Sequence, residues 1–253
     1  MLIKKSYSTE QKSYSDRLHI IGQIILSIAV FVFFAIVTGL VQIAHVIMKT
    51  GDFEIAMNVL TENMYYGVAI ASIIGSYYSI LLIFIIVQYL YKENIYSYLN
   101  ISRFLDLGKT FKYLIIFILW MFFVSLIAER FGLTSLAEGG EEFAQSLFKN
   151  EKNLILLILA VGIIQPIFEE ILFRGFLFKH LERKWGGVIA IICTSIVFSI
   201  IHFQYNLFVL GAILFPMAIL LGIARLKTKS VMTPIIIHCM NNTITLVMTM
   251  QNQ

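Results

Sequence analysis

Residues 165–174 read QPIFEEILFR, and almost purely apolar runs flank them at residues 154–164 and 175–178. The carboxylates of Glu169 and Glu170 and the guanidinium of Arg174 therefore interrupt a stretch that otherwise predicts a membrane-spanning helix. Each ionised group near a bilayer centre costs roughly 2.5–3.5 kcal/mol on insertion scales. The cluster thus predicts that these groups face protein or trapped water, and an intramembrane ionisable cluster indicates a functional site.

The composition around this stretch indicates a polytopic helical membrane protein. Of the 253 residues, 59% are hydrophobic and 13% are charged, against about 25% charged in a soluble domain. The mean hydropathy is +0.85. The net charge of +4 therefore describes membrane topology, and we expect membrane lipids and no nucleic acid as partners. Cys193 and Cys239 both lie inside apolar runs, so the sequence predicts no disulfide framework.

Seven apolar stretches predict an all-α bundle of about seven transmembrane helices. They cover approximately residues 19–48, 66–91, 113–128, 154–178, 187–203, 207–226 and 231–250. The fourth helix is expected to continue past the membrane through residue 183, and residues 51–65 predict an interfacial helix or a short loop. The chain is thus divided into a basic tail (1–18), three N-terminal helices with their connectors (19–153) and a four-helix core (154–253).

The distribution of lysine and arginine predicts the orientation. With the N-terminus inside, the inner segments carry 14 of these residues and the outer segments carry 4, and Arg174 completes the 19. This asymmetry predicts a multi-pass plasma-membrane protein with a cytoplasmic N-terminus and an external C-terminus. The abundance of Ile, Phe, Lys and Asn points to an AT-rich genome and favours a bacterial source.

Helical spacing divides the opening cluster into a pair and a single acid. Glu170 and Arg174 are four residues apart and share a helix face, with the acid N-terminal to the base. Glu169 lies about 100° around the helix, where no second cation is near in sequence. An unpaired, desolvated carboxylate suits general acid or base catalysis. The Glu170–Arg174 pair is equally consistent with a structural salt bridge that packs two helices.

Two later spans supply groups that could act with Glu169. Phe198 and His202 are one helical turn apart in the fifth span, and His238 and Asn242 are one turn apart in the seventh. Taken singly, such residues also fit core packing or hydrogen bonds between helices. Their joint occurrence with an unpaired acid favours an active site.

This set of residues is consistent with two kinds of hydrolase. A glutamate and a histidine can deprotonate a water, while a histidine and an asparagine can donate hydrogen bonds to an oxyanion. Alternatively, Glu169, His202 and His238 form a His2Glu zinc site with water as the fourth ligand. The sequence alone leaves both mechanisms open. It contains neither H-E-x-x-H nor G-x-S-x-G.

The ordered motifs E-E-x-x-x-R (169–174), F-x-x-x-H (198–202) and H-x-x-x-N (238–242) resemble the CPBP family. These are CAAX-protease and bacteriocin-processing intramembrane endopeptidases, also called the Abi family, and the likeness covers residues 154–250. It implies a catalytic core at 154–253 and a glutamate-type protease acting on a small peptide or a membrane protein. It further implies no metal cofactor, with zinc as the alternative.

The resemblance also implies a role for each motif residue. Glu169 and His202 would activate the attacking water, and His238 and Asn242 would stabilise the oxyanion. Glu170, Arg174 and Phe198 would support the site.

Two other function classes remain open at the level of the sequence. One is a non-catalytic bacteriocin-immunity or regulatory protein that binds a peptide or a membrane partner. The other is a proton-coupled transporter with Glu169 as carrier, which does not explain the His and Asn spacings. The predicted spans also contain a mismatch, because Glu169 would lie about 9 residues from the cytoplasmic side and His202 about 15 residues.

Overall fold

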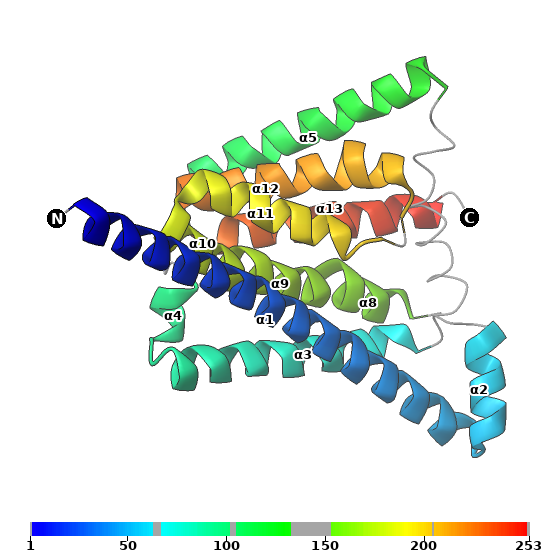
Figure 1. Cartoon of the computed structure of the whole chain (residues 1–253). Helices are drawn as coiled ribbons and strands as arrows, with labels where there is room; N and C mark the ends of the chain where they lie inside the picture. Colours follow the sequence, from blue (N-terminus) through cyan, green and yellow to red (C-terminus); the bar gives the residue numbers. More distant parts are fainter. Residues whose placement is uncertain (1, 63–66, 102–104, 133–152, 204, 252–253) are drawn as a thin grey trace.

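The computed structural model describes residues 2–62, 67–101, 105–132, 153–203 and 205–251, with the backbone alone at 2–20, 62, 250 and 251. Within these ranges the chain is helical and contains no strand (Figure 1). The helices are α1 (Leu2–Thr50), α2 (Phe53–Glu62), α3 (Val68–Ile85) with η1 (Ile86–Leu90), α4 (Ile95–Tyr98), α5 (Leu107–Arg130), α11 (Gly187–Ile200), η4 (Val209–Leu214) with α12 (Phe215–Thr228), and α13 (Met232–Gln251).

The fourth predicted span forms one continuous helical stretch from Leu154 to Trp185. It consists of α8 (Leu154–Leu157), η2 (Ile158–Ile164), α9 (Gln165–Glu170), η3 (Ile171–Leu177) and α10 (Phe178–Trp185), in which the η segments are π-helical. Its expected continuation past residue 178 is therefore confirmed. Helices α3, α11, α12, α13 and α1 all pack against this stretch, which places the opening cluster inside the bundle.

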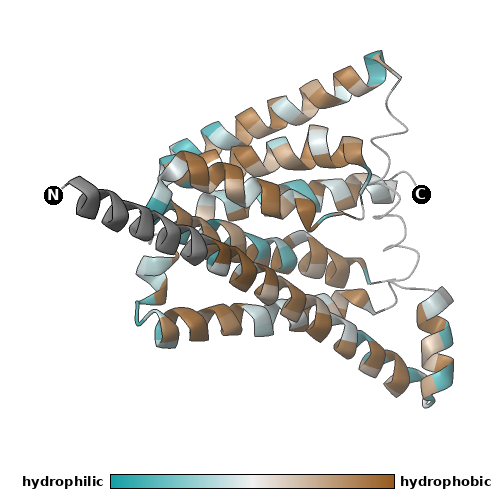
Figure 2. Cartoon of the chain, in the orientation of Figure 1, coloured by the Kyte–Doolittle hydropathy of each residue, from teal (hydrophilic) through white to brown (hydrophobic). Residues whose placement is uncertain are grey.

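The all-α membrane bundle is confirmed, although its helices differ in length from the predicted spans. In the described part of the chain, five helices are long and apolar enough to cross a membrane: Ile21–Thr50, Val68–Leu90, Leu107–Arg130, Leu154–Trp185 and Val209–Thr228. The predicted fifth span is shorter, since α11 has 14 residues and ends at Ile200. Many large apolar side chains of α1, α3 and α5 are exposed, and Figure 2 shows that the long helices are predominantly hydrophobic.

Two boundaries differ from the prediction for identifiable reasons. Helix α5 begins at Leu107 because the Asp106 carboxylate accepts a hydrogen bond from the Lys109 amide at 2.9 Å and caps the first turn. Residues 2–18, predicted as a tail, continue helix α1, and this segment contains no glycine or proline to end a helix. Residues 53–62 form helix α2, so this segment is a helix, the first of the two alternatives predicted for residues 51–65.

Close packing of α1 on α3 depends on a glycine. A Cβ atom on Gly75 would lie 2.3 Å from Thr38 Oγ1 and 3.2 Å from the Phe34 ring. Helix α3 has small buried side chains at Ala71 and Ser79, one turn on either side of Gly75. Small residues at this spacing allow helix backbones to approach closely in a membrane.

Two prolines each follow a π-helical segment. Pro166 comes after η2, and Pro216 comes after η4. Proline has no N–H to donate, so it leaves carbonyl groups in the preceding turn without their usual partner. In the first case α13 supplies replacements: Asn242 Nδ2 donates to the Val161 carbonyl at 3.3 Å and Thr243 Oγ1 to the Gly162 carbonyl at 3.4 Å. The helix that carries the glutamates is thereby bound to α13.

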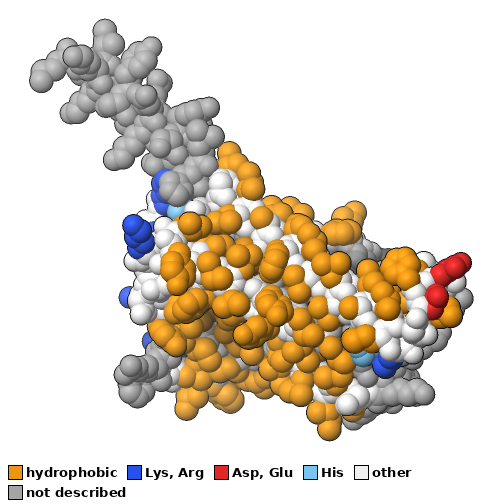
Figure 3. Space-filling view, turned by 90° about the horizontal axis from the view of Figure 1, so that it is seen from below, with side chains coloured by type: hydrophobic (Ala, Val, Ile, Leu, Met, Phe, Trp, Pro, Cys, Tyr) orange, Lys and Arg blue, Asp and Glu red, His pale blue; other side chains and the backbone are white. Residues whose placement is uncertain are grey.

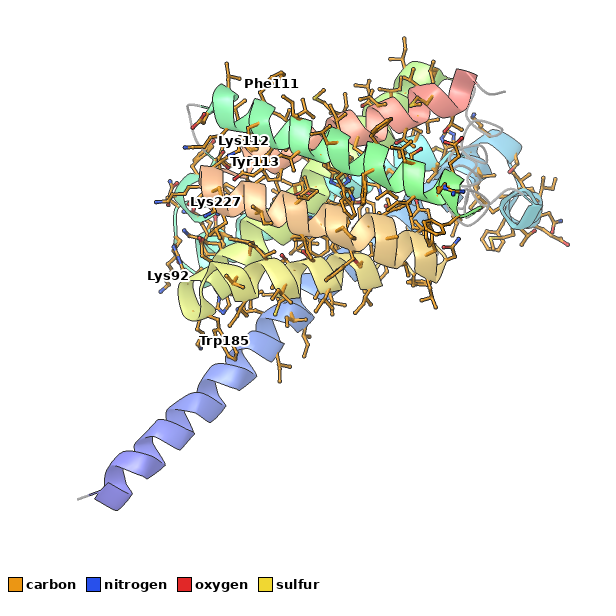
Figure 4. All side chains as sticks on the ribbon, turned by 90° about the horizontal axis from the view of Figure 1, so that it is seen from above. Lys92, Phe111, Lys112, Tyr113, Trp185 and Lys227 are labelled. Carbon is orange, nitrogen blue, oxygen red and sulfur yellow. The ribbon has the colours of Figure 1, made fainter. Side chains whose placement is uncertain are left out.

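The two ends of the bundle differ in charge. On the face shown in Figure 3, most basic side chains lie beside the N-terminal helix and the acidic side chains lie at the opposite end. The end that carries Lys92, Lys112 and Lys227 (Figure 4) is called the basic end below. The Lys and Arg asymmetry predicts that the basic end is cytoplasmic.

Candidate active site

The centre of the site is a fully buried ion pair. Arg174 Nη1 donates to Glu170 Oε1 at 2.9 Å, and neither side chain is accessible to solvent. Arg174 Nη2 donates to the Ala218 carbonyl of α12 at 3.0 Å. The Arg174 guanidinium also lies 4.7 Å from the centre of the Phe198 ring on α11. Glu170 and Arg174 therefore connect three helices, in the pairing that their spacing predicts.

His238 joins this pair from α13. Its Nδ1 atom lies 2.9 Å from Glu170 Oε1. Because an ionised carboxylate can only accept a hydrogen bond, Nδ1 carries the proton. The Nε2 atom faces the other acid, at 3.8 Å from Glu169 Oε2. The histidine thus lies between the two adjacent carboxylates. It is within hydrogen-bond distance of Glu170 but not of Glu169.

Glu169 has a different environment from Glu170. Its Oε1 atom accepts a hydrogen bond from Gln165 Nε2 at 3.0 Å, and the residue is only 3% exposed. No lysine or arginine forms a salt bridge with it among the described residues. Glu169 is therefore a buried acid held by an amide and facing an imidazole.

His202 is connected to the other site residues by its contacts with Phe198. It lies in the turn directly after α11, where its Nδ1 atom is 2.7 Å from the Phe198 carbonyl. A carbonyl only accepts, so Nδ1 carries the proton and Nε2 of the neutral ring has a free lone pair. The Phe198 ring lies 4.6 Å from the His202 ring and 5.9 Å from the His238 ring. Both histidines and Arg174 therefore contact one aromatic side chain, but no hydrogen bond joins the described residues His202 and Glu169.

Asn242 lies one turn beyond His238 and already has partners. One of its N–H groups donates to the Val161 carbonyl, and its Oδ1 accepts from Asn241 Nδ2 at 3.1 Å. A side-chain amide has two N–H groups, so one donor remains for another acceptor. Asn242 thus forms a hydrogen bond between helices, which is one of the roles that the sequence left open for it. Its second N–H group remains to donate to an oxyanion.

The zinc alternative does not fit the described part of the chain. In it, no three His, Cys, Asp or Glu side chains are grouped so that they could hold a metal ion. The residues Glu169, His202 and His238 are therefore not arranged as one ligand set.

Two residues that hold this site were missed in the sequence. Gln165 lies four residues before Glu169, so its helical spacing could have identified it. Arg225 was counted in a cytoplasmic connector, but it lies within α12 and is fully buried. Its Nε atom donates to the Arg174 carbonyl at 2.9 Å. Hydropathy alone gives no signal for this contact, because an arginine at the end of a span is also expected to reach the interface.

The mismatch in depth between Glu169 and His202 comes from the predicted end of the fourth span. The helix continues to Trp185 and turns at Gly186, whose φ of 84° lies in the region that favours glycine. Glu169 lies 17 residues before this glycine and His202 lies 16 residues after it. Counted from the turn, the two residues are at nearly equal distances along their helices.

The site lies within a segment that matches a known family model. Residues 151–244 match the family model described as type II CAAX prenyl endopeptidase Rce1-like. This segment is therefore similar to that family. The predicted resemblance to CAAX proteases is thus confirmed. The matched segment contains Glu169, Glu170, Arg174, Phe198, His202 and the motif residues of α13.

Three curated bacterial proteins resemble the chain over the same part. An uncharacterised 24.3 kDa protein of Escherichia coli is 30% identical over 108 residues, which are 41% of this chain and 50% of that protein. YdiL of Bacillus subtilis, whose name describes a membrane peptidase, is 31% identical over 111 residues, 44% of either chain. The membrane-embedded CAAX protease MroQ of Staphylococcus aureus is 29% identical over 113 residues, 41% of this chain and 44% of MroQ.

The aligned part thus spans half or less of each relative. No solved structure matches the chain.

Proposed function

We propose that the chain is an intramembrane endopeptidase of the glutamate type, which hydrolyses a peptide bond in a small peptide or a membrane-associated protein. One observation carries the proposal: in the segment that matches the Rce1-like family model, Arg174 and His238 both bind Glu170, while the adjacent Glu169 is buried and forms no salt bridge with a lysine or arginine among the described residues. The family match supports protease activity, and the separation of the two acids supports Glu169 as the base.

The proposed reaction begins with a water beside Glu169. The oxygen of this water attacks the scissile carbonyl carbon while Glu169 accepts one of the water's protons. His202 assists by accepting a hydrogen bond at Nε2, the atom with the free lone pair. The electron pair of the carbonyl moves to its oxygen and forms an oxyanion. When the carbonyl re-forms, the C–N bond breaks and the leaving amine takes the proton from Glu169.

His238 and Asn242 are the proposed donors to the oxyanion. Because Glu170 accepts from Nδ1, His238 donates from Nε2 only as a cation. The second N–H of Asn242 is the other donor. Removing one such donor typically costs about 10²–10³ in kcat. Burial of the surrounding groups strengthens these hydrogen bonds, because the local dielectric is low.

Purified protein in detergent, incubated with prenylated and unprenylated peptides and analysed by mass spectrometry, tests the proposal. Wild type is expected to cleave at least one peptide, whereas Glu169→Gln and His202→Ala are not. Glu54→Gln is the matched control, because Glu54 is exposed on α2 far from the site in sequence. Cleavage by Glu169→Gln at the wild-type rate would refute the assigned base.

The same assay tests zinc. Activity that survives exhaustive chelation, without stoichiometric zinc by elemental analysis, supports the glutamate-type mechanism. Activity that is lost on chelation and restored by zinc would overturn it.

A non-catalytic binding role is the second candidate, and the hydrogen bonds of Asn242 and Gln165 favour it. Both side chains bind groups of the protein itself. Such a chain would act as a bacteriocin-immunity or regulatory protein with a peptide or membrane partner. Cells that keep their full phenotype with Glu169→Gln would indicate this role.

A further inference from the structure

Arg225 is a fully buried cation that the proposed reaction does not use. It lies near the end of α12 and has no exposed surface. Among the described residues it forms no salt bridge, although the charge of Glu182 on α10 acts on it. Burying a charge without a direct partner is costly, and an apolar side chain would fill the same space without this cost. The hydrogen bonds of Arg225 therefore indicate what the residue contributes.

Arg225 and Arg174 each bind the helix that carries the other. Arg174 Nη2 donates to the Ala218 carbonyl of α12 at 3.0 Å, and Arg225 Nε donates to the Arg174 carbonyl of η3 at 2.9 Å. Ala218 and Arg225 are seven residues apart, about two helical turns, so they share one side of α12. The guanidinium and the backbone of Arg174 are thus both bound to the same helix.

The Arg174 carbonyl lacks its α-helical donor because it lies in the π-helical segment η3. In an α-helix the Phe178 N–H would donate to the Arg174 carbonyl, but here it donates to the Phe173 carbonyl. Single π-helical turns inside α-helices occur frequently at functional sites. Arg225 Nε supplies a donor to the Arg174 carbonyl, and the Phe178 ring centre lies 5.2 Å from the Arg225 guanidinium. Arg225 therefore stabilises the π-helical turn at Arg174.

The geometry of this turn determines where the Arg174 guanidinium lies. Glu170 ends α9 and Arg174 lies in the middle of η3, so the π-helical turn sets the angle between them around the helix axis. Glu170 Oε1 accepts hydrogen bonds from Arg174 Nη1 and His238 Nδ1, each at 2.9 Å. A change in the turn would move Arg174 relative to Glu170 and disturb the carboxylate that holds His238.

We propose that Arg225 is a positioning residue for the candidate active site. By holding the Arg174 carbonyl, it keeps Arg174 in place beside Glu170, and Glu170 in turn orients His238, the proposed oxyanion donor. This inference rests on the proposed function. It adds a residue of α12, a helix that contributes no residue to the three sequence motifs.

Kinetics on the purified full chain in detergent, with a peptide that wild type cleaves, test this proposal. Arg225→Met keeps a long side chain without a donor and is expected to lower kcat about tenfold or more, the usual effect of losing a supporting contact. KM should change by less than about twofold, because the lost interaction acts in the transition state and Arg225 is not expected to contact the substrate. Arg225→Lys keeps the charge but lacks the planar fork, so its kcat should fall between those of Arg225→Met and wild type.

The hydrogen bond between His238 and Glu170 gives a readout that needs no cleavage. In wild type with isotope-labelled histidine, the Nδ1 proton of His238 is expected to give a downfield NMR signal, because a carboxylate accepts it. This signal is identified by its loss in His238→Gln. Arg225→Met is expected to shift it, whereas a variant that only lowers stability elsewhere is not.

Two variants are matched controls. Lys227→Met removes a cation at an exposed position of the same helix, and Glu182→Gln removes the carboxylate whose charge acts on Arg225. Both are expected to keep the kcat and the His238 signal of wild type.

Either a wild-type kcat or an unchanged His238 signal in Arg225→Met would overturn the positioning role. If Arg225→Met fails to fold, the same result in Arg225→Lys would overturn it. If wild type cleaves no peptide, the proposed function fails, and the His238 signal alone decides the inference: a shift in Arg225→Met supports it and an unchanged signal overturns it.

Discussion

Two adjacent carboxylates in this chain have opposite environments. Glu170 is bound by Arg174 and His238, whereas the partners of Glu169 among the described residues are the Gln165 amide and an imidazole nitrogen at 3.8 Å. A buried charge without its partner is strongly destabilising, and a buried pair is not. The same residue type is therefore structural at position 170 and available for chemistry at position 169.

The first prediction compares Glu170→Gln with Glu169→Gln. The change at Glu170 leaves Arg174 buried without its partner, so we expect a loss of about 3–5 kcal/mol in unfolding free energy. The change at Glu169 is expected to abolish cleavage but to alter stability by less than about 1 kcal/mol. Chemical unfolding in detergent micelles measures both. Equal destabilisation by the two variants would contradict the separate roles.

The second prediction concerns Gln165, which we regard as a positioning residue. Gln165→Leu removes the hydrogen bond that orients Glu169. Loss of such a supporting contact is expected to lower kcat about tenfold or more. KM should not change, because Gln165 is not expected to contact the substrate. Unchanged kcat, or a change confined to KM, would exclude this role.

The Glu93–Arg183 pair gives the third prediction. Arg183 holds the pKa of Glu93 below its ordinary value of 4.5 through their hydrogen bonds. A lowered pKa stabilises the folded state above 4.5, and this contribution is lost as the pH falls through the folded value. Both side chains are partly exposed, so the pair is expected to contribute only about 0.2–1 kcal/mol. The stability difference between wild type and Glu93→Gln should be constant near neutral pH and should shrink in acid; a difference that grows in acid would contradict this assignment.

At the scale of helices, the sequence predicted the elements better than their details. Apolar length predicted the long helices, and helical spacing predicted the Glu170–Arg174 contact, because both depend on neighbouring residues. The π-helical turns before Pro166 and Pro216 were not predicted, nor was the end of α11 before His202. These features depend on which carbonyl groups the neighbouring helices satisfy, as Asn242 does for Val161. Hydropathy does not contain that information.

The fourth prediction tests the contact between α1 and α3. Gly75→Ala places a Cβ within 2.3 Å of Thr38 Oγ1. The two helices must then separate, and we expect a loss of about 1–3 kcal/mol in unfolding free energy. Gly39→Ala is the matched control, because a Cβ there has no atom within 4 Å. The second change Thr38→Ala should partly restore Gly75→Ala, and equal effects of the two glycine variants would refute the close contact.

At the scale of the whole molecule, the orientation in the membrane decides which end of the bundle faces the cytoplasm. The basic end is predicted to be cytoplasmic, which puts α2 and Glu54 outside. The fifth prediction therefore uses single cysteines at Lys92 and Glu54, in a chain with Cys193 and Cys239 replaced by alanine. An impermeant maleimide on intact cells is expected to label the cysteine at 54 and to label the one at 92 only after lysis, since the charge asymmetry directs basic loops inward. The reverse pattern would place the basic end at the outer surface and would contradict the predicted orientation.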